Sequence, residues 1–194
     1  SSFTDKQGTW VRNQDEIDRD ETMEQAIITG IAHDRGEAKI TVVGVPDRVG
    51  EAAAIFTAVA DADVNIDMIV QNISRLSDVK TDISFTLPMS DGAKAIAAIE
   101  AIKDEVGFEE LLYDDQIGKV SAVGVGMRSH PGVSATFFRA LAEADVNLQM
   151  ISTSEIRISV IVGADDVDAA VRASHTAFGL DAEETATVYA GTGR

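Results

Sequence analysis

The apolar positions of this chain follow two spacings, one typical of strands and the other typical of helices. Residues 38–45 are rich in β-branched side chains, which predicts a strand. Over 51–60, Ile55, Phe56 and Val59 recur at helical spacing, which predicts an amphipathic helix. The same patterns predict further strands at 25–32, 65–71, 82–87, 111–113, 119–125, 148–152, 156–162 and 186–190, and helices from 90 to about 105, over 132–144 and over 165–178.

The chain also carries one sequence pattern twice. The segment around Gly44 matches that around Gly124, and the segment around Asn65 matches that around Asn147. The offset is 80 residues at the glycines and 82 at the asparagines, so the second copy has two extra residues in one loop. The order β-α-β-β-α-β therefore occurs twice. With right-handed crossovers, this predicts an α+β protein of two units, each an antiparallel sheet with helices on one face.

The repeat suggests how the chain is divided. Residues 1–22 are polar, with five acidic side chains in the eight residues 14–21, and we interpret them as a solvated linker. The first domain is expected over 23–110 and the second over 111–194. The strand at 25–32 either pairs as a hairpin with 38–45 or completes the sheet of the second unit, and the sequence leaves both arrangements open.

Composition excludes several function classes. The formal net charge is −17, which repels phosphate backbones and anionic lipid, so we expect no nucleic-acid partner and no membrane partner. An RNA-recognition module would share the strand and helix order, but it needs a basic face and aromatic side chains on its sheet. The chain has no Cys and its three His lack ligand spacing, so no metal site is expected. A cytoplasmic location agrees with this composition.

Sequence motifs do not assemble a catalytic site. Gly124-Val-Gly126 fails as a dinucleotide-binding loop, because Ser129 stands where the third glycine is needed. No nucleophile, base and orienting group occur together, so we predict no catalytic residue and disfavour a complete small enzyme.

One candidate binding feature occurs in both copies, a glycine between a loop and a helix. We call residues 47–52 junction one and residues 129–134 junction two. Exposed N–H groups at a helix N-terminus suit a carboxylate, and Asp47 suits an ammonium group, so together they suit an amino acid. The alternative is that each glycine only ends a turn and Asp47 only caps a helix. Asn65 and Asn147 either bind the ligand or form Asx turns, and the polar residues that end the following strands either line a pocket or solvate a hairpin.

Several runs of residues resemble the regulatory part of bacterial aspartate kinase. They lie at 28–35, 67–72, 112–116, 129–132, 148–160 and 188–193, and the resemblance covers about 23–194. It is greatest to the β subunit of the lysine- and threonine-inhibited actinobacterial type, which arises from an internal start in the gene of the α subunit. Met23 lies where that start would fall, and residues 1–22 resemble the end of the catalytic domain. The regulatory module of another amino-acid biosynthetic enzyme is the alternative, and the run at 152–160 weighs against it.

This resemblance implies the fold, the partners and the cofactors. The fold would be two ferredoxin-like ACT domains, one inserted into the other. ATP and Mg would bind a kinase domain that this chain lacks, so the chain itself would hold no cofactor. Its partners would be a second copy, through the ACT domains, and the aspartate kinase α subunit or catalytic domain. Its effectors would be threonine and lysine, bound between ACT units to give feedback inhibition.

The resemblance also implies the effector-binding residues. The first pocket, which would bind threonine, would take Asp47, Gly50, Ala52 and Gln71 from one chain and Asn147 and Leu148 from its partner, with Ser74 just beyond Gln71. The second pocket would take His130, Gly132, Val133, Ser134, Thr153, Ser154 and Glu155, with Asn65 and Ile66 facing them. Val49 stands where the family commonly has a proline, which would loosen the loop of junction one.

Overall fold

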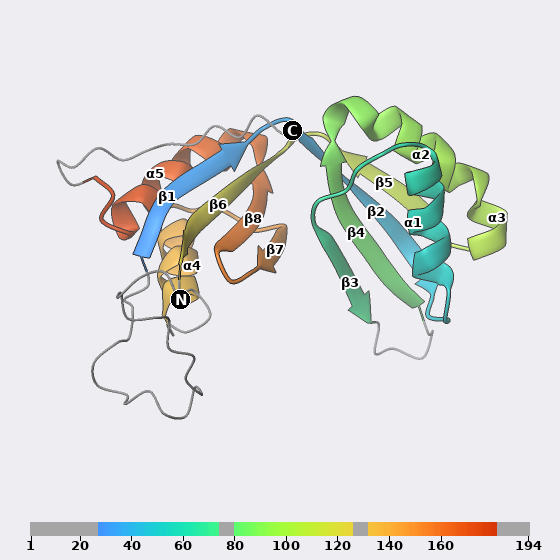
Figure 1. Ribbon diagram of the computed structural model, residues 1–194, viewed down its shortest axis with the longest axis horizontal. Helices are drawn as coiled ribbons and strands as arrows, with labels where there is room; N and C mark the ends of the chain where they lie inside the picture. Colours follow the sequence, from blue (N-terminus) through green and yellow to red (C-terminus); the bar gives the residue numbers. More distant parts are fainter. Residues whose placement is uncertain (1–26, 74–79, 126–131, 182–194) are drawn as a thin grey trace, which may run out of the picture.

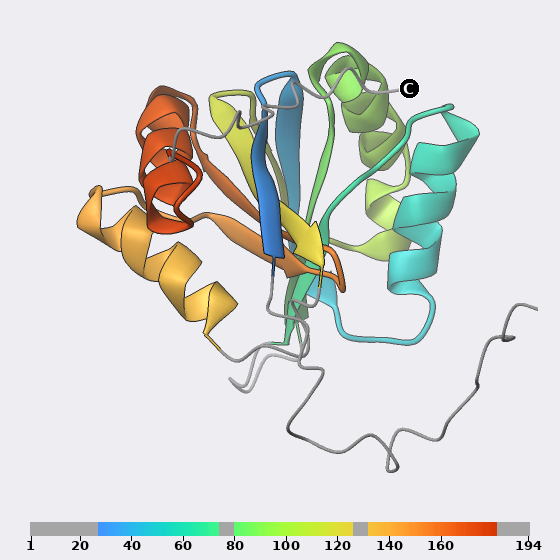
Figure 2. The same cartoon turned by 60° about the vertical axis from the view of Figure 1, so that its left-hand side comes forward.

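The chain forms two units whose sheets face each other and whose helices lie on the outside (Figures 1 and 2). The computed structural model describes residues 27–73, 80–125 and 132–181. Unit one comprises β2 (Glu37–Pro46), α1 (Glu51–Asp61), β3 (Ile69–Ile73), β4 (Lys80–Pro88), a 3₁₀ turn (Met89–Asp91), α2 (Gly92–Ala101), α3 (Lys103–Val106) and β5 (Glu110–Asp114). Unit two comprises β1 (Ile27–Asp34), β6 (Ile117–Val125), α4 (Val133–Glu143), β7 (Met150–Thr153), β8 (Arg157–Gly163), a 3₁₀ turn (Ala164–Asp166) and α5 (Val167–Ala177).

Both sheets are four-stranded and antiparallel within the described residues. Their strand orders are β3-β4-β2-β5 and β1-β6-β8-β7. The predicted α+β fold with helices on one face of each sheet is therefore confirmed. The strands that follow Asn65 and Asn147, β3 and β7, lie at sheet edges.

The first strand belongs to the second sheet. β1 pairs with β6, with Ile31 opposite Ala122, although only Arg35 and Gly36 separate it from β2. A hairpin with β2 does not form because β4 and β5 already occupy both edges of β2. β5 likewise closes the sheet of unit one, so the expected boundary between residues 110 and 111 moves to 115–116.

The chain thus crosses between the units twice. β1 of unit two leads directly into β2 of unit one, and β5 of unit one leads directly into β6 of unit two. The two crossings have matching turns, in which Asp34 Oδ1 accepts from the N–H of Gly36 at 2.7 Å and Asp114 Oδ1 accepts from the N–H of Gln116 at 2.9 Å. These are Asx turns, in which an Asp side chain accepts a hydrogen bond from the backbone N–H two residues further on.

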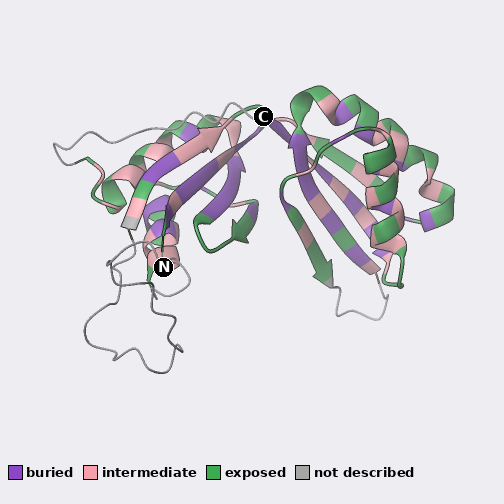
Figure 3. Cartoon of the chain, in the orientation of Figure 1, coloured by how far each residue is buried: buried purple, intermediate pink, exposed green. Residues whose placement is uncertain are grey.

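Each unit has its own apolar core between sheet and helices (Figure 3). Phe85 and Ile55 lie in the core of unit one, and Phe137 and Leu141 lie in that of unit two, all fully buried. Burying such a side chain contributes roughly 1.5–3 kcal/mol. Two separate cores agree with two folding units of one repeat.

Some element boundaries differ from the prediction. β3 and β7 begin at Ile69 and Met150, later than expected. Asp63 and Asp145 adopt positive φ just after the preceding helices, and residues 64–68 and 146–149 then form loops before the two strands. The helix expected up to about residue 105 breaks at Ile102 (φ −104°, ψ 9°), so α2 and α3 are separate. The predicted linker 1–22 and strand 186–190 lie outside the described residues.

Candidate functional site

Junction one is an uncapped helix N-terminus behind a left-handed glycine. Gly50, the N-cap of α1, has φ 106° and ψ −20°, and no side chain caps the helix. The Gly50 carbonyl accepts from the Ala54 N–H at 2.9 Å, and the Arg48 carbonyl lies 3.5 Å from the Glu51 nitrogen as its acceptor. No side chain accepts from the first-turn N–H groups. Because no side chain makes a cap hydrogen bond to α1, the alternative role of Asp47 as a helix cap is wrong. Asp47 is exposed, and Ala52 lies half-buried in the first turn.

Junction two repeats this geometry. Gly132 is the N-cap of α4 with φ 113° and ψ −23°, again without a side-chain cap, and its carbonyl accepts from the Thr136 N–H at 2.8 Å. Val133 and Ser134 lie half-buried in the first turn. Among the described residues, a Cβ at either glycine would meet nothing within 4 Å, so the space beside each glycine is open there. His130 lies outside the described residues.

The charges near the two junctions differ. In junction one, Arg48 Nη2 lies 2.6 Å from Glu51 Oε1 and 3.5 Å from the Val106 carbonyl oxygen. Junction two has Val133 where junction one has Glu51. The repeated site therefore keeps its backbone and changes its first-turn side chains.

The strand residues Gln71 and Thr153 point to the side of the sheet on which the helices lie. Gln71 is paired with Ile83, and Thr153 with Ile158, and both isoleucines belong to the cores beneath the helices. Residues directly opposite in an antiparallel pair project to the same face. In unit one, β3 ends at the same end of the molecule at which α1 begins (Figure 1). Gln71 is exposed there, and Ser74, which follows β3, lies outside the described residues.

Some residues of the second pocket have local roles. Ser154 closes the β7–β8 hairpin, because its N–H donates to the Arg157 carbonyl at 2.7 Å and its hydroxyl donates to the same oxygen at 3.2 Å. This agrees with the hairpin alternative for Ser154. Thr153 and Glu155 are exposed.

Asn65 and Asn147 are exposed loop residues rather than the first residues of strands. The residues after them, Ile66 and Leu148, pack against the cores of their own units. Asn65 follows the C-terminus of α1, whereas Gly50 precedes its N-terminus, and an 11-residue helix spans roughly 16 Å. A single unit therefore does not bring its asparagine to its own junction.

The other unit of the same chain does not supply the asparagine to junction one either. Gln149, two residues after Asn147, accepts a hydrogen bond from Lys39 Nζ near the start of β2. Junction one follows the far end of that strand, and the seven steps from Lys39 to Pro46 span about 23 Å. The residues predicted for the first pocket therefore lie apart within one chain.

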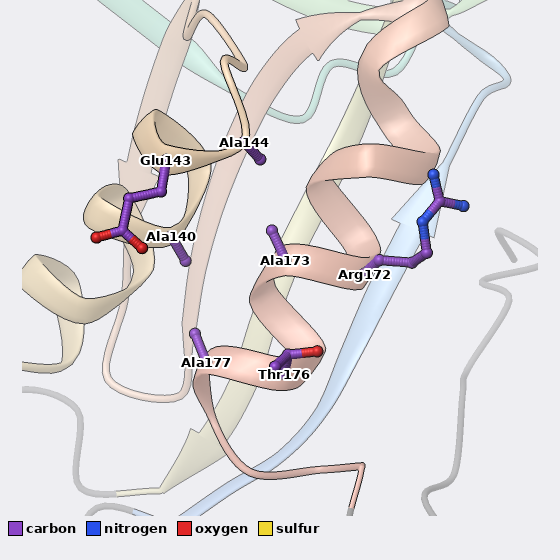
Figure 4. A pocket seen from close by; sticks show the side chains of 7 residues that line it. All are labelled: Ala140, Glu143, Ala144, Arg172, Ala173, Thr176 and Ala177. Carbon is purple, nitrogen blue, oxygen red and sulfur yellow. The ribbon is translucent and has the colours of Figure 1, made fainter.

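Two concavities occur elsewhere on the described surface. One of about 450 Å³ lies between α4 and α5 (Figure 4), lined by Ala140, Glu143, Ala144, Arg172, Ala173, Thr176 and Ala177. Its alanines face each other, while Glu143 and Arg172 point away from its centre, so it presents neither charge that an amino acid requires. The other, of about 340 Å³, is lined by Val43, Gly44, Asn72, Lys80, Thr81, Asp82 and Glu109. No residue proposed for effector binding lines either concavity.

Two exposed apolar side chains on the edge strands were not predicted from the sequence. Ile69 on β3 is 48% exposed and Ile151 on β7 is 44% exposed. They are equivalent in the repeat, and this equivalence is the signal that could have identified them.

Among the described residues, no group of three or more His, Asp or Glu could hold a metal ion. None of the described helices is long and apolar enough to span a membrane.

The ACT domain family matches residues 40–102 and 120–178, which correspond to the two units. The chain belongs to the ACT domain family. It is 59% identical to the aspartokinase of Mycolicibacterium smegmatis over all 194 residues, which make up 45% of that protein. The chain thus spans somewhat less than half the length of the curated aspartokinases it matches.

Solved structures place these ACT units among aspartokinase regulatory regions. The chain matches a structure of aspartokinase alpha and beta subunits with a TM-score of 0.74 and 46% identity, over 79% of this chain and 99% of that one. It matches the ligand-free regulatory subunit of aspartate kinase from Thermus thermophilus with a TM-score of 0.74 and 40% identity, over 78% and 98%. The resemblance to aspartate kinase regulatory domains is therefore confirmed.

Proposed function

We propose that these ACT units bind threonine and lysine and transmit that binding as feedback inhibition of aspartate phosphorylation. The observation that carries the proposal is the pair of uncapped helix N-termini, each behind a left-handed glycine. Peptide N–H groups and the helix dipole attract the ligand's carboxylate at both junctions. At junction one, the exposed Asp47 carboxylate attracts the ligand's ammonium group.

Each pocket is completed by a second copy of the chain. This completion is supported by the separation of each asparagine from the junction of its own unit, and of Asn147 from junction one. It is supported by the exposed Ile69 and Ile151 on the edge strands, because an unpaired strand edge with an apolar side chain favours pairing with another sheet. Edge pairing of two copies brings a junction of one chain towards the asparagine loop of the other.

The catalytic chemistry belongs to another part of the enzyme. In this proposal ATP and Mg bind the kinase domain, supplied by the rest of the polypeptide or by an α subunit in the cytoplasm. The ACT dimer changes the activity of that domain when its pockets fill, which requires different effector affinities in the active and inhibited states.

Calorimetry with threonine, lysine, methionine and isoleucine tests the effector assignment. We expect saturable binding of threonine and of lysine, and none of isoleucine. Sedimentation with and without threonine tests the dimer. Ligand at about 100 times its dissociation constant adds roughly 2.7 kcal/mol per site to dimer stability, a shift of about a hundredfold. The absence of threonine and lysine binding would contradict the proposal.

A further inference from the structure

The sheet faces turned away from the helices pack against each other across the two units (Figure 2). The centre of this interface is a small apolar cluster of Met68, Ile117, Met150 and Ile161, with Val70 packed against it. Met68 and Met150 are equivalent in the repeat, since Met68 immediately precedes β3 and Met150 begins β7. Each unit therefore contributes the equivalent methionine to this interface, whereas Glu37 stands in unit one where unit two has Ile117.

Two lysines cross this interface in opposite directions. Lys39, near the start of β2, donates to Gln149 Oε1, and Lys119, near the start of β6, donates to Asp67 Oδ2 at 2.7 Å. Lys39 and Lys119 are equivalent in the repeat, and so are Asp67 and Gln149. Each unit thus uses the same strand position to hold the loop that precedes the edge strand of the other.

The Lys119 contact is the more buried and the more highly charged of the two. The Lys119 side chain is 13% exposed and also donates to Glu37, whose side chain is 10% exposed. Glu37 Oε2 is buried with no hydrogen-bond partner of its own, so Lys119 compensates the Glu37 charge. Burial opposes the charge of Lys119, but hydrogen bonds to Asp67 and Glu37 outweigh it and raise its pKa. Lys39, by contrast, has its nearest carboxylate, Asp114, at 3.6 Å.

Lys119 connects two elements that the proposed function uses. Asp67 is two residues after Asn65, in the loop before β3. β6 is held on both sides by β1 and β8, and it runs from Lys119 towards junction two. A strand paired on both edges moves as a unit, so a displacement of the Asn65 loop acts on β6 through Lys119.

We propose that Lys119 is a positioning residue that couples the two copies of the second pocket in a dimer, by fixing the Asn65 loop to the strand that leads to junction two. This inference rests on the proposed function. In a dimer, each chain gives Gly132 to one copy of that pocket and Asn65 to the other, so a contact within one chain links both copies. Lys39 makes the equivalent, weaker link for the first pocket.

The test is calorimetric titration of the full 194-residue chain with threonine and, separately, with lysine. The effector of the second pocket is the one whose binding Asn65→Ala weakens. We expect a Hill coefficient above 1 for it in wild type. Lys119→Met should reduce that coefficient to about 1, and Lys119→Arg, which keeps the charge, should retain it. Lys39→Met, at the equivalent position, should leave it unchanged.

A Hill coefficient of 1 in wild type, or full cooperativity in Lys119→Met, would overturn the coupling role. If neither effector binds to wild type, it is the proposed function that fails. Should Lys119→Met not fold, Asp67→Ala removes the contact between Lys119 and the Asn65 loop and leaves Lys119 in place beside Glu37. We expect the same loss of cooperativity from it, and retained cooperativity in that variant would overturn the inference.

Discussion

Junctions one and two have nearly the same backbone and different side chains. Gly50 and Gly132 adopt the same left-handed conformation, and both helices begin without a side-chain cap. In the first turn, Glu51 and Ala52 stand where the second copy has Val133 and Ser134. The shared backbone suits the carboxylate that all amino acids carry. We therefore infer that the first-turn side chains distinguish one effector from the other.

The largest effect on effector binding is expected from replacing one asparagine at a time. Asn147→Ala should weaken binding at the first pocket by roughly 1–3 kcal/mol, about 5- to 150-fold, because ligand groups lose a hydrogen-bond partner. Asn65→Ala should have an effect of that size at the second pocket and leave the first unchanged. Calorimetry with each effector measures both. Equal weakening of both effectors by one variant would contradict two separate pockets.

The equivalence of the two backbones can be tested through stability. Gly50→Ala and Gly132→Ala should each destabilise the chain by about 1–2 kcal/mol, because a Cβ is strained at positive φ although both sites are open. Urea unfolding gives the two values. If one substitution has no effect while the other destabilises, the two junctions are not equivalent.

A smaller difference concerns the equivalent lysines at the interface between the units. The raised pKa of Lys119 means that its contribution to stability is complete below its usual value of 10.5 and is lost as the pH rises through the folded value. Melting temperatures measured between neutral and strongly alkaline pH should fall more steeply in wild type than in Lys119→Met. Equal slopes for these two proteins would contradict a charged Lys119 in the folded chain.

The smallest expected effect is that of the ion pair in junction one. Arg48 is 63% exposed, so Glu51→Gln should change stability by less than about 1 kcal/mol. Glu51→Val, which copies junction two, should bring the effector preferences of the two pockets closer together. A competition titration with threonine and lysine measures that preference, and an unchanged preference would assign discrimination to other residues.

Local pattern was sufficient to predict the two units. β-branched runs and helical spacing marked the strands and helices, and the offset between Gly44 and Gly124 marked the repeat. The pairing of β1 was not predictable, because it depends on which edges of β2 other strands already occupy. The start of β3 was misplaced because Ile66 and Met68 continue the alternating apolar pattern of the strand although residues 65–68 form a loop. In that loop Ile66 packs against the core of unit one and Met68 packs between the units.

The candidate site was only partly predictable for a similar reason. Glycine before a helix is a local signal, so both junctions could be found from the sequence. Contacts between the units, such as Lys119 with Asp67, join residues far apart in the chain and follow no local spacing. The repeat equivalence of Lys39 and Lys119 is visible in the sequence, but nothing there indicates that both face the other unit.

A mixing experiment tests most directly whether each pocket is shared between two chains. Asp47→Ala impairs junction one, and Asn147→Ala impairs the facing loop, so each variant alone should bind threonine weakly. Mixed and allowed to exchange, they form dimers in which one chain supplies an intact junction and the other an intact asparagine. About a quarter of the threonine sites should then regain wild-type affinity, as expected for random pairing of two chains in a symmetric dimer. No recovery after complete exchange would place each pocket within a single chain and contradict a shared pocket.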